Sequence, residues 1–149
     1  MTESKARLVG INHIALEVDD IDASIDFYKR ILAFELRGRH GNRMAFLDAG
    51  DQFIALSTPR SQPPDEDRHF GLVVDDKQAL RDALNANGVE ILPGRGLDFR
   101  DPSGNRIQIV EYSEIQFTKT AAALRSVGVA DDAKTPAAQK ELRDKGLMD

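Results

Sequence analysis

Two octapeptides determine the fold predicted for this chain: HIALEVDD at His13–Asp20 and HFGLVVDD at His69–Asp76. Each begins with a histidine, continues with apolar residues on one strand face and ends in a pair of aspartates. The similarity continues in register further along the chain, where Gly38-Arg39 corresponds to Gly94-Arg95 at the same shift of 56 positions. A match over this distance indicates an internal duplication, because repeated sequence is the signature of repeated structure.

Both copies have the same predicted order of elements: a strand, a helix and three further short strands. The first strand ends at the aspartate pair, which can cap the following helix, and apolar residues then recur at helical spacing. In the first copy we expect these elements at Ile11–Val18, Ile21–Ile31, Ala33–Gly38, Met44–Asp48 and Phe53–Ser57. In the second copy we expect them at His69–Val74, Lys77–Ala86, Val89–Leu92, Leu97–Arg100 and Arg106–Tyr112. The predicted fold class is α+β, with two tandem βαβββ modules forming a curved mixed sheet around a metal and substrate cavity.

The paired modules are expected within residues 1–112, at about 8–57 and 69–112. The polar, proline-containing stretch 58–68 is the predicted linker between them. Residues 113–149 fall outside the repeat and are expected to form a helical extension. One helix is predicted at Phe117–Val127, and another begins near Thr135-Pro136, where proline suits the first helical turn. We expect this extension to cover the pocket mouth or to pack on a neighbouring subunit.

The composition excludes several classes of function. The chain has 149 residues, a net charge of −5 and 41% hydrophobic residues, which suits an ordinary globular domain. It has no basic stripe that would neutralise phosphates, so a nucleic-acid partner is not expected. Its apolar runs are too short to cross a bilayer and its N-terminal residues lack a signal-peptide core, so we predict no membrane partner and a cytoplasmic location. Without cysteine, thiolate chemistry and disulfides are excluded.

The repeat places two histidines at equivalent positions on strands. Because alternate side chains of a strand share a face, His13 points away from the apolar Leu16 and Val18, which we expect beneath the helices. His69 points the same way in the second copy. A pseudo-twofold axis relating the two modules would therefore let the two imidazoles meet on the open side of the sheet.

The last strand of each copy supplies a third candidate ligand. Matching the turn at Gly50 with the turn at Gly104 aligns Ser57 with Glu111. Two imidazoles and one carboxylate form a set that holds Fe, Mn, Ni or Zn as a divalent ion and leaves coordination positions open. We therefore predict that His13, His69 and Glu111 bind one divalent metal ion, and that Glu111 is also the catalytic residue.

The duplicated pattern resembles the vicinal oxygen chelate superfamily. The resemblance covers about Leu8–Tyr112, and its most specific motifs are NHIALEVDDIDASIDFYKRILAFEL at Asn12–Leu36 and FRDPSGNRIQIVEY at Phe99–Tyr112. The superfamily includes glyoxalase I, extradiol dioxygenases, fosfomycin-resistance thiol transferases, methylmalonyl-CoA epimerase and bleomycin-resistance proteins. The resemblance implies a metal ion that chelates oxygens of a small substrate, with His13, His69 and Glu111 at the ligand positions.

The resemblance leaves the reaction open. Ser57 stands where the isomerases carry a glutamate ligand, and Ala15 stands where the thiol transferases carry a threonine. The predicted enzyme is therefore either an oxidoreductase of the extradiol dioxygenase kind or a lyase or transferase of the glyoxalase or thiol-transferase kind. The competing interpretation is a metal-free protein that binds a drug or metabolite, as the bleomycin-resistance proteins do.

Four residues are predicted to contact the small-molecule substrate. Glu17 lies too far along its strand from His13 to share an ion, since four residues span about 13 Å, and it is expected to line the cavity. Arg95 could pair with a substrate carboxylate, Phe99 could form an apolar wall, and Ser57 lies near the predicted metal. We also expect a homodimer, because related proteins commonly pair.

Overall fold

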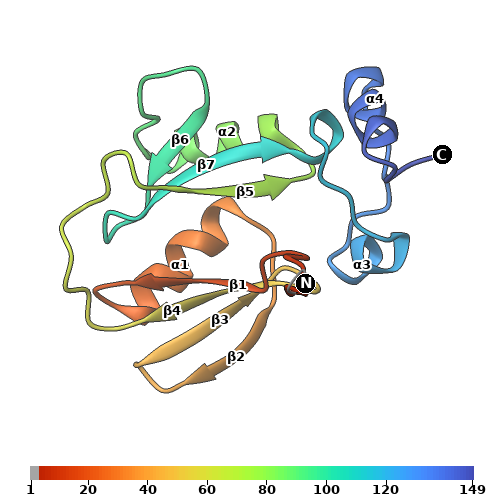
Figure 1. Cartoon of the computed structure of the whole chain (residues 1–149). Coiled ribbons are helices and arrows are strands. Elements are labelled where there is room, and N and C mark those ends of the chain that lie inside the picture. Colours follow the sequence, from red (N-terminus) through yellow and green to blue (C-terminus); the bar gives the residue numbers. More distant parts are fainter. Residues whose placement is uncertain (1–3) are drawn as a thin grey trace.

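The computed structural model describes residues 4–149 and contains two successive β-α-β modules followed by short helical segments (Figure 1). The first module consists of β1 (His13–Glu17), α1 (Ile21–Ile31), β2 (Leu36–His40), β3 (Met44–Asp48) and β4 (Phe53–Ser57). The second consists of β5 (Phe70–Val74), α2 (Lys77–Ala86), β6 (Leu97–Arg100) and β7 (Arg106–Glu111). The C-terminal extension contains a 3₁₀ helix η1 (Tyr112–Glu114), α3 (Ala121–Ser126) and α4 (Pro136–Asp144). The predicted α+β class is confirmed.

The aspartate pairs begin the two module helices, as predicted. The side chain of Asp20 accepts a hydrogen bond from the backbone N–H of Ala23, at 2.7 Å. Asp76 does the same for Ala79, at 3.0 Å. These bonds satisfy N–H groups that have no partner inside the first helical turn. Both helices have the predicted bounds.

The seven strands form two separate sheets. The first has the order β1-β4-β3-β2, and the second has the order β5-β7-β6. In each sheet the first strand of the module runs parallel to the last one, and the remaining contacts are antiparallel. β1 and β5 are edge strands, and among residues 4–149 no strand pairing joins one sheet to the other.

The predicted strands differ most from the structure at two places, and β1, β5 and β7 are each shorter than predicted by one to three residues. β2 begins at Leu36 rather than Ala33, and its pairing with β3 is irregular between Leu36 and Gly38. The predicted strand at Val89–Leu92 is reduced to one bridge between Ile91 and Phe99. Pro93, which has no N–H to donate, directly follows this segment and limits further pairing.

Each sheet turns one face toward a common core and leaves the other open. Leu16 in β1 and Val18 directly after it are buried and Ile14 packs against the same core, whereas His13 and Ala15 are exposed. This division of faces confirms the alternation predicted for the strand. The core contains residues of both sheets and both module helices, so the modules share one apolar interior: Leu16, Val18, Ile21, Ile25, Tyr28, Ile31, Ala45, Leu47, Ile54, Leu56, Leu80, Leu84, Leu97, Phe99, Ile107 and Ile109.

The turn between β6 and β7 fastens the second module to the first. The buried carboxylate of Asp101 accepts hydrogen bonds from the backbone N–H groups of Ser103 and Asn105 and from the Asn105 amide. It also accepts one from the hydroxyl of Tyr28 on α1, at 2.8 Å. The Ser103 hydroxyl in turn accepts a bond from the backbone N–H of Asp19. This segment does more than reverse the chain, because its polar groups connect the modules.

The C-terminal extension lies against both modules. α3 approaches the turn at Gly50, where an added Cβ would meet Ser126 and Val127 at 3.5 and 3.6 Å. Near the second module, the Lys134 ammonium donates to the carbonyl oxygens of Tyr112, Ile115 and Phe117. Burial lowers the pKa of Lys134 from its ordinary value. The predicted helical extension is therefore present, although α3 is shorter than the predicted helix at Phe117–Val127.

Within residues 4–149, the structure has no helix with the length and apolar character needed to cross a bilayer.

We expect Tyr28→Phe to lower the free energy of unfolding by about 2 kcal/mol. The substitution keeps the ring but removes the hydroxyl that bonds the buried Asp101 carboxylate. Urea unfolding followed by circular dichroism measures the change. Tyr112→Phe is the matched control, because that hydroxyl only accepts a long 3.3 Å bond from the Lys119 N–H. Equal stability of wild type and Tyr28→Phe would contradict the proposed role of the contact.

Candidate functional site

His13 is the first residue of β1, and its imidazole is exposed on the open face of the first sheet. Its ring stacks on Phe53, the residue paired with it in β4, with ring centroids 4.8 Å apart. Nδ1 lies 2.8 Å from the side-chain oxygen of Asn12. This contact fixes the orientation of the ring, so that Nε2 is the nitrogen left for a ligand.

His69 directly precedes β5, and its imidazole is also exposed. Its Nδ1 lies 2.8 Å from the carbonyl oxygen of Asp67. β1 begins at the end of the molecule near the N-terminus and α3, whereas β5 begins at the opposite end, beside the linker (Figure 1). Because the two histidines stand at the beginnings of these strands, a single chain does not bring them together.

Glu111 lies on the core-facing side of the second sheet. It is paired with Val74, and its carboxylate accepts hydrogen bonds from the backbone N–H of Lys77, at 2.9 Å, and the hydroxyl of Ser113, at 3.1 Å. The first of these bonds is made at the N-terminus of α2, where a negative charge is favourable. Within one chain, Glu111 therefore faces α2 and not the open side on which His69 lies.

The strand register explains this difference from the sequence prediction. Glu17 pairs with Ser57, and Val73, which is the repeat equivalent of Glu17, pairs with Val110. Ser57 therefore corresponds to Val110, one position before Glu111. A shift of one residue moves a side chain to the other face of a sheet, so the predicted equivalence of Ser57 and Glu111 is wrong.

The same register identifies the open-face residue that sequence reasoning missed. Ala15 pairs with Ala55, and Gly71, its repeat equivalent, pairs with Gln108. Gln108 therefore projects from the middle of β7 to the face on which His69 lies. Gln108 would have been found by aligning the two copies on the first residues of their last strands, Phe53 and Arg106, and not on the turn glycines.

No three histidine, cysteine, aspartate or glutamate side chains within residues 4–149 are grouped so that they could hold a metal ion. The set His13, His69 and Glu111 is therefore not assembled inside one chain, and a single chain does not provide the donors that such an ion requires.

The four predicted substrate residues occupy different environments. Ser57 lines a cavity at the end of β4, together with His40 and Arg43. Glu17 lines a second cavity, of about 220 Å³, together with His69. Arg95 is exposed in the loop before β6. The prediction that Phe99 forms a pocket wall is wrong, because its side chain is fully buried in the core.

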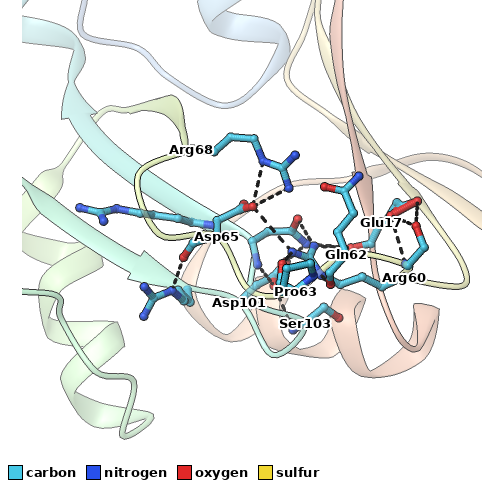
Figure 2. Close-up of polar contacts among 12 residues, drawn as sticks. Glu17, Arg60, Gln62, Pro63, Asp65, Arg68, Asp101 and Ser103 are labelled. Atoms are coloured by element: carbon cyan, nitrogen blue, oxygen red, sulfur yellow. Dashed lines mark hydrogen bonds and ion pairs between the residues drawn. The ribbon is translucent and has the colours of Figure 1, made fainter.

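A buried arginine that the sequence analysis did not single out organises the linker (Figure 2). The Arg60 side chain is only 4% exposed, and each of its nitrogens donates a hydrogen bond. The acceptors include the carbonyl oxygen of Glu17 in the first module, at 3.1 Å, and the side-chain oxygen of Asn105 in the second, at 2.6 Å. Arg60 therefore holds the end of β1 close to the β6–β7 turn. A basic residue inside the proline-containing linker was the available signal.

Asp65 forms the neighbouring part of this network. Its carboxylate accepts hydrogen bonds from the Arg68 guanidinium and from the backbone N–H of Arg106, and it lies 3.7 Å from Arg60. Burial raises the pKa of Asp65, but the bonds from Arg68 and Arg106 and the charges of Arg68 and Arg60 outweigh it, so the net shift is downward. The ionised carboxylate therefore stabilises the folded linker.

Comparison with known proteins places this chain in a family. The model of the Glyoxalase/Bleomycin resistance protein/Dioxygenase superfamily matches residues 10–109. The chain therefore belongs to this superfamily, as the resemblance of its motifs implied. The C-terminal extension lies outside the match.

Two curated relatives are similar over about two thirds of this chain. A protein named metallothiol transferase FosB, from Staphylococcus epidermidis, is 34% identical over 116 residues, which cover 68% of this chain and 81% of the relative. A protein named glutathione transferase FosA, from Serratia marcescens, is 30% identical over 114 residues, covering 68% of this chain and 80% of the relative. Both names describe transferases, and neither specifies what this chain acts on.

Solved structures support the fold. The fosfomycin resistance protein FosX from Listeria monocytogenes superimposes with a TM-score of 0.60 at 19% identity, over 70% of this chain and 94% of that one. Lactoylglutathione lyase from Agrobacterium tumefaciens gives 0.58 at 22% identity, over 70% and 95%. At this identity the likeness concerns the arrangement of the modules and not their chemistry.

We expect Asp65→Asn to lower the free energy of unfolding at pH 7 by about 2 kcal/mol. Because the folded-state pKa is lowered, the wild-type contribution is complete above the unfolded-state pKa of about 3.9 and is lost as the pH falls through the lower folded value. The variant should therefore show a smaller loss of stability on acidification, measured by urea unfolding between neutral and acidic pH. Asp67→Asn is the control, because that residue is exposed. Identical acid profiles of wild type and Asp65→Asn would contradict this assignment.

Proposed function

We propose that this protein is a metal-dependent enzyme that acts on a small molecule, and that it is of the transferase kind. The identity of 34% with a metallothiol transferase over 68% of this chain supports this proposal most strongly. A second support is the presence of histidine at the start of both repeated strands, with each ring exposed and oriented through its Nδ1. The lyase and dioxygenase alternatives have no relative of comparable identity among those described above.

The proposed metal centre requires a second copy of the chain. His13 and His69 stand at opposite ends of one molecule, so an ion bound by both would join His13 of one copy to His69 of another. β1 and β5 are edge strands, so each has a row of backbone groups that no strand covers. A twofold dimer that brings β1 of one copy beside β5 of the other would place two such centres symmetrically. The homodimer is thus part of the proposal.

The third ligand of the proposed metal centre, beside His13 and His69, is either Glu111 or Gln108. Glu111, the predicted ligand and catalytic residue, would have to leave its bond to the Lys77 N–H and turn to the open face. Gln108 already projects to that face, and an amide oxygen is an acceptable ligand for a hard divalent ion. We therefore favour His13, His69 and Gln108 as the set. An ion bound there would polarise an oxygen of the substrate.

A metal-free binding protein is the second candidate function. It is favoured by one observation, namely that the open-face position of β7 carries the neutral Gln108 while the nearby carboxylate of Glu111 is engaged at α2. Two imidazoles and an amide attract a divalent ion less strongly than a set that includes a carboxylate. The amount of bound metal therefore separates the two functions.

We expect tag-free protein reconstituted with Mn, Fe, Ni or Zn to bind about one ion per chain. The substitution His69→Ala should weaken that binding about tenfold or more, because it removes one ligand of the ion. Calorimetry and elemental analysis measure both quantities. His40→Ala is the matched control, as His40 is the remaining histidine of the chain. Protein that binds no metal after reconstitution would contradict the enzyme and favour the binding protein. Light scattering on the same samples would refute the shared centre if the metal-loaded protein were monomeric.

Paired substitutions identify the third donor. We expect Gln108→Ala to weaken metal binding about tenfold or more, because it removes one of the three proposed donors. Glu111→Gln should change the binding little, because Glu111 faces α2. Calorimetry with the same ion compares the two variants directly. Circular dichroism confirms that each remains folded. The reverse result would return Glu111 to the ligand set.

A further inference from the structure

A cavity of about 370 Å³ lies where the turn between β2 and β3 meets the end of β4. Its lining contains two basic side chains, His40 and Arg43, the hydroxyls of Ser57 and Thr58, and Met44. Among residues 4–149, no acidic side chain belongs to this lining. The Thr58 hydroxyl donates to the carbonyl oxygen of Asn42, which leaves the Ser57 hydroxyl as a donor to a ligand. The cavity therefore combines the positive charge of Arg43 with a hydroxyl donor, which is the chemistry that recognises an anion.

The charged groups at the cavity are Arg43 and, beside it, Glu17. The Arg43 side chain is exposed, and within residues 4–149 its guanidinium forms no hydrogen bond or ion pair. The Glu17 carboxylate, across from Ser57 in β1, keeps its negative charge, and the backbone N–H and the hydroxyl of Ser61 hold it toward the linker, at 3.2 and 3.0 Å. Asp48 stands at the far end of β3, paired with Phe53. Arg43 is thus available to an incoming ligand.

A row of rings leads from this cavity across the open face of the first sheet. The ring of His40 meets that of Phe46 edge-on at 5.8 Å, and Phe46 meets Phe53 in the same way at 5.8 Å. Phe53 stacks on His13 at 4.8 Å, and the Arg37 guanidinium lies 4.7 Å from the centre of the Phe53 ring. Rings arranged in this way offer an apolar surface beside a cationic pocket.

We propose that this face binds a small molecule that has an anionic group at one end and an apolar body. The anionic group, a carboxylate or a phosphonate, occupies the cavity at Arg43 and His40, and the body lies on Phe46 and Phe53. Four residues of β1 separate the end of the sheet at Ser57 from the end at His13, a span of about 13 Å. A ligand of that length places its far end beside His13.

The binding of the anion in the cavity does not depend on the proposed function. A role for the far end of the ligand beside His13 does rest on the proposed function, because it requires that His13 binds the metal. If His13 binds the metal, the cavity selects substrates in which an anionic group is about 13 Å from the reacting atom. The test below uses metal-free protein, so that its failure is distinguishable from failure of the metal centre.

The test is a titration of metal-free, isotope-labelled protein followed by amide resonances in nuclear magnetic resonance spectra. The probes are phenylphosphonate, inorganic phosphate and benzyl alcohol, which separate the aromatic anion from the anion alone and from the neutral ring. We expect phenylphosphonate to shift the amides of Arg43, Ser57 and Thr58 and to bind about tenfold more tightly than either of the other probes.

Substitutions separate the two parts of the site. Arg43→Ala is expected to weaken phenylphosphonate binding about tenfold, because it removes a charge-assisted hydrogen bond. Arg125→Ala is the matched control, an exposed arginine on α3 outside the cavity. Phe46→Leu should weaken phenylphosphonate binding and leave phosphate binding unchanged, and this variant also covers the case in which Arg43→Ala does not fold.

Three results would overturn the proposal. The first is a pattern of shifted amides that excludes the cavity. The second is an equal loss of binding in Arg43→Ala and Arg125→Ala, which would indicate attraction to overall positive charge. The third is equal affinity for phosphate and phenylphosphonate, which would remove the aromatic surface from the site.

Discussion

The hydrogen bond between the Tyr28 hydroxyl and the Asp101 carboxylate is the constraint on which the arrangement of the two modules depends. Both groups are buried, so each requires a partner, and each has it in the other module. Burial, together with the charge of Asp101 and the hydrogen bond to it, raises the pKa of Tyr28 well above its ordinary value, so the hydroxyl remains a donor. Because hydrogen bonds are directional and apolar contacts are not, this contact fixes how the modules meet, together with the Asp19–Ser103 bond and the bonds of Arg60.

The sequence correctly predicted the features that local chemistry determines, such as helix bounds and strand alternation. It did not predict which face of the sheet the third ligand occupies, because that face depends on the number of residues in a turn. The aspartate caps and the helical spacing predicted α1 and α2 with their bounds, and alternation predicted which side of β1 is buried. The third metal ligand was misplaced because the first copy has two residues between Gly50 and Phe53, whereas the second has one between Gly104 and Arg106. Aligning the glycines therefore shifted β7 by one residue, which exchanged its faces. The Arg60 network was not predictable in this way, since its acceptors come from segments far apart in the sequence.

The two open faces have diverged although the modules keep one architecture. The first presents the rings of Phe46 and Phe53, and the second presents an ion pair between Asp98 and Arg106, 2.8 Å apart, beside Gln108. The core-facing residues of both copies contribute to one interior. The open faces share a histidine at the equivalent position and otherwise differ in chemistry, so a symmetric fold can accommodate an asymmetric small molecule.

Lys134 holds the chain after the second module through contacts that do not depend on the side chains of its partners. Its ammonium is held by three carbonyl oxygens, which belong to the peptide backbone and not to the side chains of Tyr112, Ile115 and Phe117. Exchange of Ile115 for another residue would leave its carbonyl in place, whereas no other residue type offers three donors on a single compact, flexible head. The fold of residues 112–117 around the Lys134 ammonium therefore requires a lysine at position 134 but no particular side chain at Ile115.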